Sequence, residues 1–125
     1  MKYHDFHLEG YSVCDFGNKI ILHLVFDYPN SPKEKSTIEF TDVVAYNFIH
    51  TGGTIITDID EVSLAELLEK FGDSLLEWSR QHGGLKFLDK DLFVYKTKLE
   101  SEAYKSWSIG SAIGFEGFVI AKSVK

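Results

Sequence analysis

The stretch from residue 63 to residue 82 constrains the fold most, because it is the longest segment with clear helical periodicity. Ser63 and Glu66 form a capping box, in which each side chain satisfies a backbone N–H group that the first turn leaves free. The two glycines after His82 end the helix, since glycine suits the left-handed cap. One apolar stripe runs along it: Leu64, Leu67, Leu68, Phe71, Leu75 and Trp78. A helix that is apolar on one side packs on another layer, so we expect it to cover a sheet.

The first part of the chain has the alternation of β-strands. Residues 5–28 predict a hairpin that turns at the DFGN sequence of residues 15–18, where Gly and Asn tolerate positive φ. In its second strand, residues 19–28, every other residue is apolar and belongs to one face: Ile20, Leu22, Leu24, Phe26 and Tyr28. Residues 28–35 contain both prolines and predict a loop within the domain. A strand at residues 37–41 follows it.

A second hairpin is predicted around Thr51-Gly52-Gly53. Residues 43–50 and 54–60 flank this sequence and have strand character, and Gly-Gly between two such runs is a strong hairpin signal. We therefore expect these two strands to pair with each other.

The segment from residue 89 to residue 104 is open to two interpretations. Its apolar residues share a helical face, whereas Phe93-Val94-Tyr95 has strand propensity. The residues of the helical face are Leu88, Leu92, Tyr95, Leu99 and Ala103.

Three glycines lie close together in the sequence WSIGSAIGFEGFVIA, residues 107–121. Their spacing fits neither a phosphate-binding loop nor a dinucleotide fingerprint, and an apolar strand rather than a helix follows the last of them. We expect two antiparallel strands at residues 107–113 and 118–124, joined at residues 114–117. Gly110 then marks a bulge or a close approach of another backbone. Altogether the 125 residues predict a single α+β domain, with an antiparallel sheet of about six strands covered by one long helix and, in the helical interpretation of residues 89–104, a second.

The formal charge of −6 bears on possible partners. The thirteen basic residues include a single arginine, Arg80, so nucleic acid is an unfavoured partner and a basic protein a favoured one. The alternative is that the charge only keeps the protein soluble. The candidate partner-binding residues are Asp58, Asp60, Glu61, Glu66, Glu69 and Asp73. The first three could instead stabilise the positive end of the following helix.

Other features predict where the protein works. Cys14 is the only cysteine, which excludes an intramolecular disulfide and favours a reducing compartment, so we expect a cytoplasmic protein. The sequence shows no apolar leader and no membrane span. Cys14 has no flanking basic residue, which disfavours a nucleophilic role.

The histidines are the remaining candidates for chemistry. In a strand, Asp5, His7 and Glu9 would project from one side and could hold a divalent metal, although alternating polar residues more often mark a solvated face. His7, His23 and His50 could act in a pocket between helix and sheet, but no motif supplies them with a nucleophile. We predict no catalytic residue, no metal and no cofactor.

Four segments carry a resemblance to known proteins: HDFHLEGYSV, IILHLVFDY, STIEFTDVVAYNF and SIGSAIGFEGFVIAKSV. Their order resembles a group of small bacterial domains of unknown function, some of which are similar to immunity proteins that neutralise toxins. The resemblance implies a non-enzymatic protein-interaction domain and carries over no catalytic residue. The alternatives are a small-ligand binder or small enzyme that uses the histidines, and a homodimer formed through a sheet edge.

Overall fold

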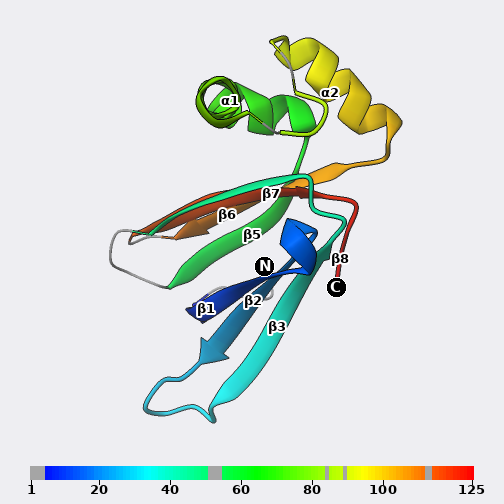
Figure 1. Cartoon of the computed structure of the whole chain (residues 1–125). Coiled ribbons are helices and arrows are strands. Elements are labelled where there is room, and N and C mark those ends of the chain that lie inside the picture. The colour runs from blue at the N-terminus through cyan, green and yellow to red at the C-terminus, as the bar shows by residue number, and fades with distance from the viewer. Residues whose placement is uncertain (1–4, 51–54, 84, 89, 112–113) are drawn as a thin grey trace.

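The computed structural model describes residues 5–50, 55–83, 85–88, 90–111 and 114–125. Within these ranges the fold is α+β, with two α-helices, a short 3-10 helix at Asp15–Gly17 and eight strands in two antiparallel sheets (Figure 1). The first sheet has the order β1-β2-β3-β8: β1 His7–Cys14, β2 Lys19–Phe26, β3 Glu34–Thr41 and β8 Ser123–Val124. The second has the order β4-β7-β6-β5: β4 Ala45–His50, β7 Phe115–Ala121, β6 Lys105–Ser111 and β5 Ile56–Val62. The helices are α1, Leu64–His82, and α2, Leu92–Ser101. No helix in the described ranges is long and apolar enough to cross a membrane.

The two sheets face each other and enclose a first hydrophobic core, which corrects the expectation of one sheet of about six strands. Alternate residues of the longer strands point into this core, as their period of two requires. Its buried members are Phe6, Leu8, Ile20, Leu22, Leu24, Ile38, Phe40, Val43, Ile56, Trp107, Ile109, Phe115, Val119 and Ala121. A single flat sheet could not have buried both this set and the residues beneath the helices.

Backbone hydrogen bonds join the two sheets on both sides. On one side, the N–H of Asp5 donates to the carbonyl of Ile56 at 3.0 Å, and the N–H of Ile56 donates to Phe6 at 2.7 Å. On the other side, the chain bends after β7 and continues into β8, which pairs with β3. The N–H and carbonyl of Lys125 extend this pairing through two 2.9 Å bonds to Glu39. The strands thus form a nearly continuous wall around the first core.

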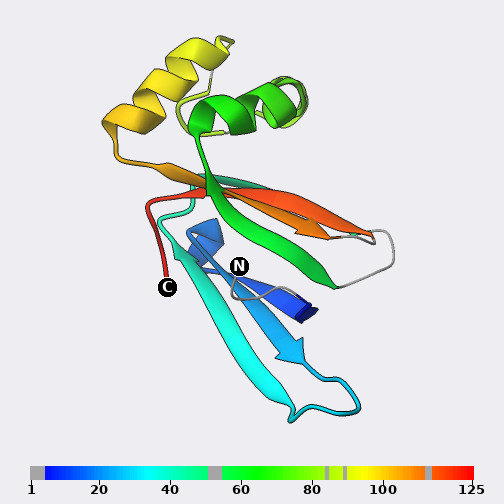
Figure 2. The same cartoon turned by 180° about the vertical axis from the view of Figure 1, so that it is seen from behind.

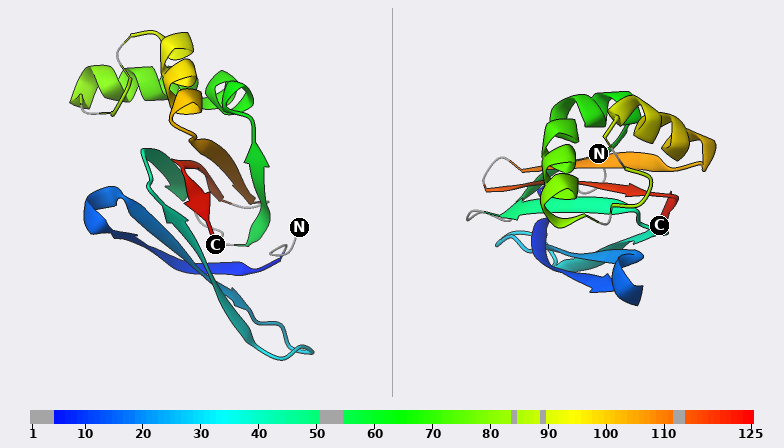
Figure 3. Two further views of the ribbon diagram at one scale, coloured as in Figure 1. Left: turned by 90° about the vertical axis from the view of Figure 1, so that its right-hand side faces the viewer. Right: turned by 45° about the horizontal axis from the view of Figure 1, so that its top comes forward.

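The helices form a third layer on the outer face of the second sheet (Figure 3). Figure 2 shows that β5 leads directly into α1. The predicted cap is present, since the side-chain oxygen of Ser63 accepts the Glu66 N–H at 3.1 Å. The predicted stripe of α1 packs on the sheet, with Trp78 only partly buried at its end. The buried members of this second core are Ala45, Leu64, Leu67, Leu68, Phe71, Leu75, Leu88, Tyr95, Leu99, Phe118 and Ile120.

Residues 92–101 form α2, the helical alternative of the two that the sequence left open. Asp91 starts the helix, because its Oδ1 accepts the N–H groups of Phe93 at 2.8 Å and Val94 at 3.4 Å. Both of these side chains are exposed, while Tyr95 and Leu99 are fully buried. The cap and the spacing of these two core residues therefore outweigh the strand propensity of Phe93-Val94-Tyr95.

The predicted hairpin of residues 43–60 is wrong. β4 pairs with β7 and β5 pairs with β6, so the two strands lie at opposite edges of the second sheet. The central positions belong to β6 and β7, and β7 is apolar enough to be buried on both faces. β5, with its two exposed aspartates, suits an edge. The turn at Thr51-Gly52-Gly53 lies outside the described residues.

The C-terminal hairpin is confirmed, but its second strand begins at Phe115, earlier than predicted. β6 and β7 are antiparallel, and Phe115, Glu116 and Gly117 belong to β7. The close approach of another backbone occurs at Gly117, where a Cβ atom would collide with the carbonyl of Asn47 on β4. Gly110 lies opposite Asp58 at a register shift in β5, which agrees with the bulge alternative.

Candidate functional site

The outer face of the second sheet, which carries the helices, has three rows of side chains that the strand register aligns. The first row lies under the helices: Ala45, Ile120, Ser106 and Val62. The middle row is Asn47, Phe118, Ser108 and Asp60. The last row is Ile49, Glu116, Gly110 and Asp58. Because residues paired across antiparallel strands share a face, each row crosses the whole sheet.

Helix α1 covers this face only in part. Phe71 packs on Phe118, with ring centroids 4.7 Å apart, so the helix reaches the middle row. Beside it, a groove of about 190 Å³ opens between α1 and the strands β5 and β6. Its polar lining consists of Glu66, Lys70 and Ser108. Beyond the groove, Ile49 and Asp58 of the last row are exposed, and Gly110 and Glu116 are half-buried.

We call the exposed end of this face the acidic shelf: Ile49, Asp58, Asp60, Gly110 and Glu116. Asp58 and Asp60 are exposed at the sheet edge, and the side chain of Ile49 is 49% exposed. A Cβ atom at Gly110 would meet nothing within 4 Å, so the middle of the shelf is open space above bare backbone. The shelf therefore offers a flat floor with carboxylates on both sides and one apolar residue at its end.

One carboxylate of the acidic shelf is paired with a lysine, and the two aspartates are not paired within the described part of the chain. Nζ of Lys70 lies 2.6 Å from Oε1 of Glu116, so this lysine already compensates one carboxylate. Within the described part of the chain, no ion pair joins Asp58, Asp60 or Glu66 to a cation. Exposed ion pairs contribute little to stability, so pairing these three carboxylates would not stabilise the fold much. Left unpaired, they produce a negative potential at the surface that attracts cationic partners.

The structure brings together some of the predicted partner-binding residues and separates others. Asp58 and Asp60 lie on the shelf, and Glu66 borders it across the groove. Glu69 and Asp73 are exposed on the outward side of α1. Glu61 pairs with Trp107, a residue of the first core, and therefore lies on the other face of β5.

Sequence reasoning missed several residues of this surface. Glu116, Gly110 and Ile49 complete the shelf, and Lys70 reaches it from α1. No local motif marks them, because they come together only through the pairing of β4 with β7 and of β7 with β6. The bulge prediction at Gly110 was the nearest signal.

The structure places neither His7 nor His23 between helix and sheet, where the alternative interpretation expected a pocket. His23 lies on the outer face of the first sheet, where its Nε2 is 2.9 Å from Oγ of Ser12 and Glu9 lines the same shallow depression. The His7 ring packs against Tyr28 at a centroid distance of 5.5 Å. His50 ends β4, and its side chain lies outside the described residues.

The possible metal set of Asp5, His7 and Glu9 does not share one strand face. Asp5 precedes β1 and has a φ of 69°, and a register shift between Leu8 and Gly10 breaks the alternation at Glu9. Among the residues placed by the structure, no group of three or more His, Cys, Asp or Glu has the arrangement of a metal site.

Comparison of the chain with protein-family models, with curated proteins and with solved structures gave no match.

Proposed function

We propose that this chain is a non-enzymatic protein-interaction domain that binds a basic protein through the acidic shelf. The observation that carries the proposal is the gathering of Asp58, Asp60 and Glu66 on one surface whose facing lysine, Lys70, is held by Glu116. The net charge of −6 adds a long-range attraction for a cationic partner. A basic toxin that the domain neutralises is the partner suggested by the resemblance to immunity proteins, and a cytoplasmic location fits that role.

The open space above the backbone of Gly110 suggests how a side chain of the partner would bind. A long Lys or Arg side chain can lay its aliphatic part on the bare backbone of this residue and place its charge next to the carboxylate of Asp58. Arginine would gain most, because its planar guanidinium donates two parallel hydrogen bonds to one carboxylate. Ile49 supplies an apolar contact at the end of the shelf.

The proposal is tested by mixing the purified domain with a basic protein encoded by a neighbouring gene and measuring affinity by calorimetry. The double variant Asp58→Lys/Asp60→Lys should weaken binding about tenfold or more, because it replaces attraction with repulsion at the contact. Raising the salt concentration should weaken the wild-type complex, since screening shortens the reach of exposed charges.

The matched control is Asp27→Lys/Glu34→Lys, which makes the same charge change at two exposed positions of the first sheet and its loop. This control should retain most of the affinity. Equal losses in the two double variants would mean that overall charge rather than the shelf determines binding. Tight binding unaffected by the shelf variant would place the interface elsewhere.

A further inference from the structure

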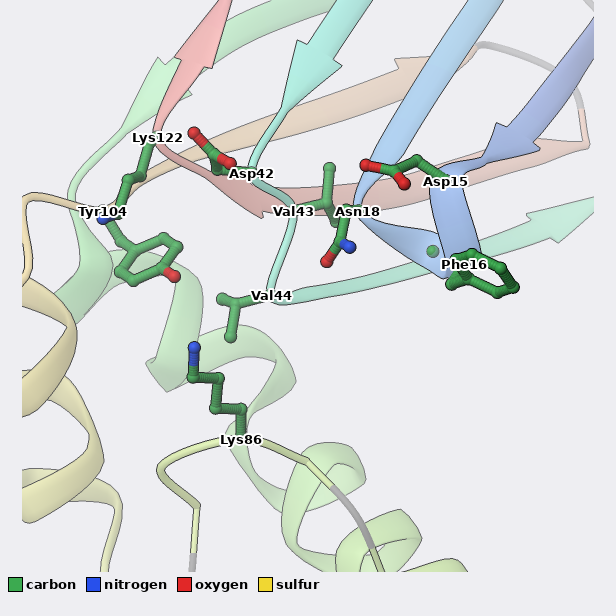
Figure 4. Close-up of a pocket in the computed structure, with 10 residues that line it drawn as sticks. Asp15, Phe16, Asn18, Asp42, Val43, Val44, Lys86, Tyr104 and Lys122 are labelled. Carbon is green, nitrogen blue, oxygen red and sulfur yellow. The ribbon is translucent and has the colours of Figure 1, made fainter.

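A second concave site lies at the opposite end of β7 from the acidic shelf. It is a cleft of about 480 Å³ where both sheets meet the helical layer (Figure 4). Five parts of the chain line it: the turn at residues 15–18, the bend at residues 42–44, the loop at Lys86, Tyr104 just before β6, and Lys122 just after β7. This volume is in the range of small-molecule sites.

Hydrogen-bond donors converge on the cleft. Figure 4 shows the amine of Lys86, the hydroxyl of Tyr104 and the amide of Asn18 directed into the space in front of Val44. Nζ of Lys122 lies 5.2 Å from the centroid of the Tyr104 ring. Neither lysine forms an ion pair with any residue that the structure describes.

Two carboxylates also border the cleft without neutralising these lysines. In Figure 4 the carboxylate of Asp42 points away from Lys86, and that of Asp15 points toward Asn18. Within the described part of the chain, neither aspartate has an ion-pair partner. Charges of both signs are thus held apart around one space, and a ligand that carries an anionic group together with hydroxyl groups can satisfy both.

Backbone conformation singles out the same place. The described chain contains six non-glycine residues with positive φ, and five of them line the cleft or directly adjoin a lining residue. These five are Asp15, Phe16, Asp42, Phe87 and Ala103. Left-handed conformations are unfavourable for Phe and Ala, and such residues gather where a fixed geometry serves binding. The lining is therefore built from conformationally restricted turns.

We infer that this cleft binds a small organic anion, a carboxylate or a phosphate, that also carries hydroxyl groups. Lys86 and Lys122 compensate the anionic group, and Tyr104 and Asn18 donate hydrogen bonds to its oxygens. The carboxylate of Asp15 accepts a hydrogen bond from a hydroxyl group of the ligand. This inference does not depend on the acidic shelf, since the two sites share no residue.

Titration of the ¹⁵N-labelled protein followed by amide NMR tests the inference. Glucose 6-phosphate and gluconate supply the two kinds of anion with hydroxyl groups, and glucose supplies the hydroxyl groups alone. We expect one or both anions, but not glucose, to shift the amide resonances of residues 15–18, 42–44, 86, 104 and 122. A response to only one of them identifies the ligand as a phosphate or a carboxylate.

Variants separate the cleft from a general attraction of anions. Lys86→Ala/Lys122→Ala should weaken binding about tenfold or more, because two charge-assisted contacts are removed. Tyr104→Phe keeps the ring next to Lys122 and should weaken binding by roughly threefold to tenfold through the lost hydrogen bond. The control Lys33→Ala/Lys125→Ala makes the same charge change at exposed positions away from the cleft. Absence of shifts with both anions, or equal weakening in the control, would overturn the inference.

Discussion

On the inner face of the second sheet, Ile109, Phe115 and Val119 are at most 2% exposed, so apolar side chains fill the sheet from one end to the other. On the outer face, burial declines from the first row, which α1 covers, to the acidic shelf, where Asp58 and Ile49 are exposed. The same strands thus support two different surfaces, because successive residues point to opposite faces. The inner face serves stability, and the uncovered end of the outer face is free to bind without a cost to the core.

The largest expected difference between the two faces is in the free energy of unfolding when adjacent residues of β6, Ile109 and Ser108, are replaced by alanine. Ile109→Ala should lower the free energy of unfolding by about 2 to 5 kcal/mol, because it removes fully buried methyl and methylene groups and leaves a cavity in the first core. Ser108→Ala, on the partly covered outer face, should change it by about 0.5 kcal/mol or less. Urea unfolding followed by circular dichroism measures both. Similar losses would show that the outer face is packed as tightly as the inner one.

The helix-side core should respond to alkaline pH. Burial, aided by the nearby Tyr104, raises the pKa of Tyr95 to about 12, and no described group bonds to its hydroxyl. The unfolded chain loses this proton near pH 10, so stability present below that pH should fall between about pH 10 and pH 12, by up to roughly 2 to 3 kcal/mol. Urea unfolding of the wild type and of Tyr95→Phe across this range isolates the effect. An equal pH dependence in Tyr95→Phe would assign it to other groups.

Gly117 and Gly110 belong to the same hairpin, but only at Gly117 would a Cβ atom meet a neighbouring strand, so substituting each of them compares a packed position with an open one. Gly117→Ala should destabilise the fold by about 1 to 3 kcal/mol, because the new methyl group would press on the backbone of Asn47 and Phe48. Gly110→Ala should change the free energy of unfolding by no more than about 0.5 kcal/mol, because its methyl group enters open space on the shelf. Thermal unfolding of the two variants gives the contrast. If Gly110→Ala destabilised the fold as much as Gly117→Ala, the space above Gly110 on the acidic shelf would not be open.

The smallest expected effect concerns the start of α1. Ser63→Ala should cost about 1 kcal/mol, since the Glu66 N–H would lose its acceptor. Ser63→Asp should restore most of that loss, because aspartate is an equally good cap. Thermal unfolding distinguishes the two. A loss in Ser63→Asp as large as that in Ser63→Ala would contradict the capping interpretation.

The sequence predicted the elements whose signals are local. The helix at residues 63–82 has its cap and its stripe within one segment, and the β1–β2 hairpin has its turn between two alternating strands. The pairing of β4 and β5 could not be predicted in this way. Gly-Gly indicated a turn between them, but which strands occupy the centre of the sheet depends on the burial of β7, a property of the whole fold.

The candidate site was predictable only in part for the same reason. Asp58, Asp60 and Glu66 lie close together along the chain, so their acidic character was visible. Glu116 joins them because β7 lies next to β6 and because Lys70 extends from α1 to meet it. Glu61 lies on the opposite face of β5 from Asp60, because successive residues of a strand point to opposite faces. The sequence could predict this separation as soon as residues 56–62 were recognised as one strand.

The bonds from Asp5 to Ile56 and from Lys125 to Glu39 have a kinetic consequence. They pair segments that are far apart in the chain, so large loops must close before these contacts form. The loss of chain entropy on loop closure therefore comes before the stabilisation by the contacts. We therefore expect slow, cooperative folding on the millisecond-to-second scale typical of sheet-rich domains of high contact order. During synthesis, the wall around the first core can close only after residue 125 has left the ribosome.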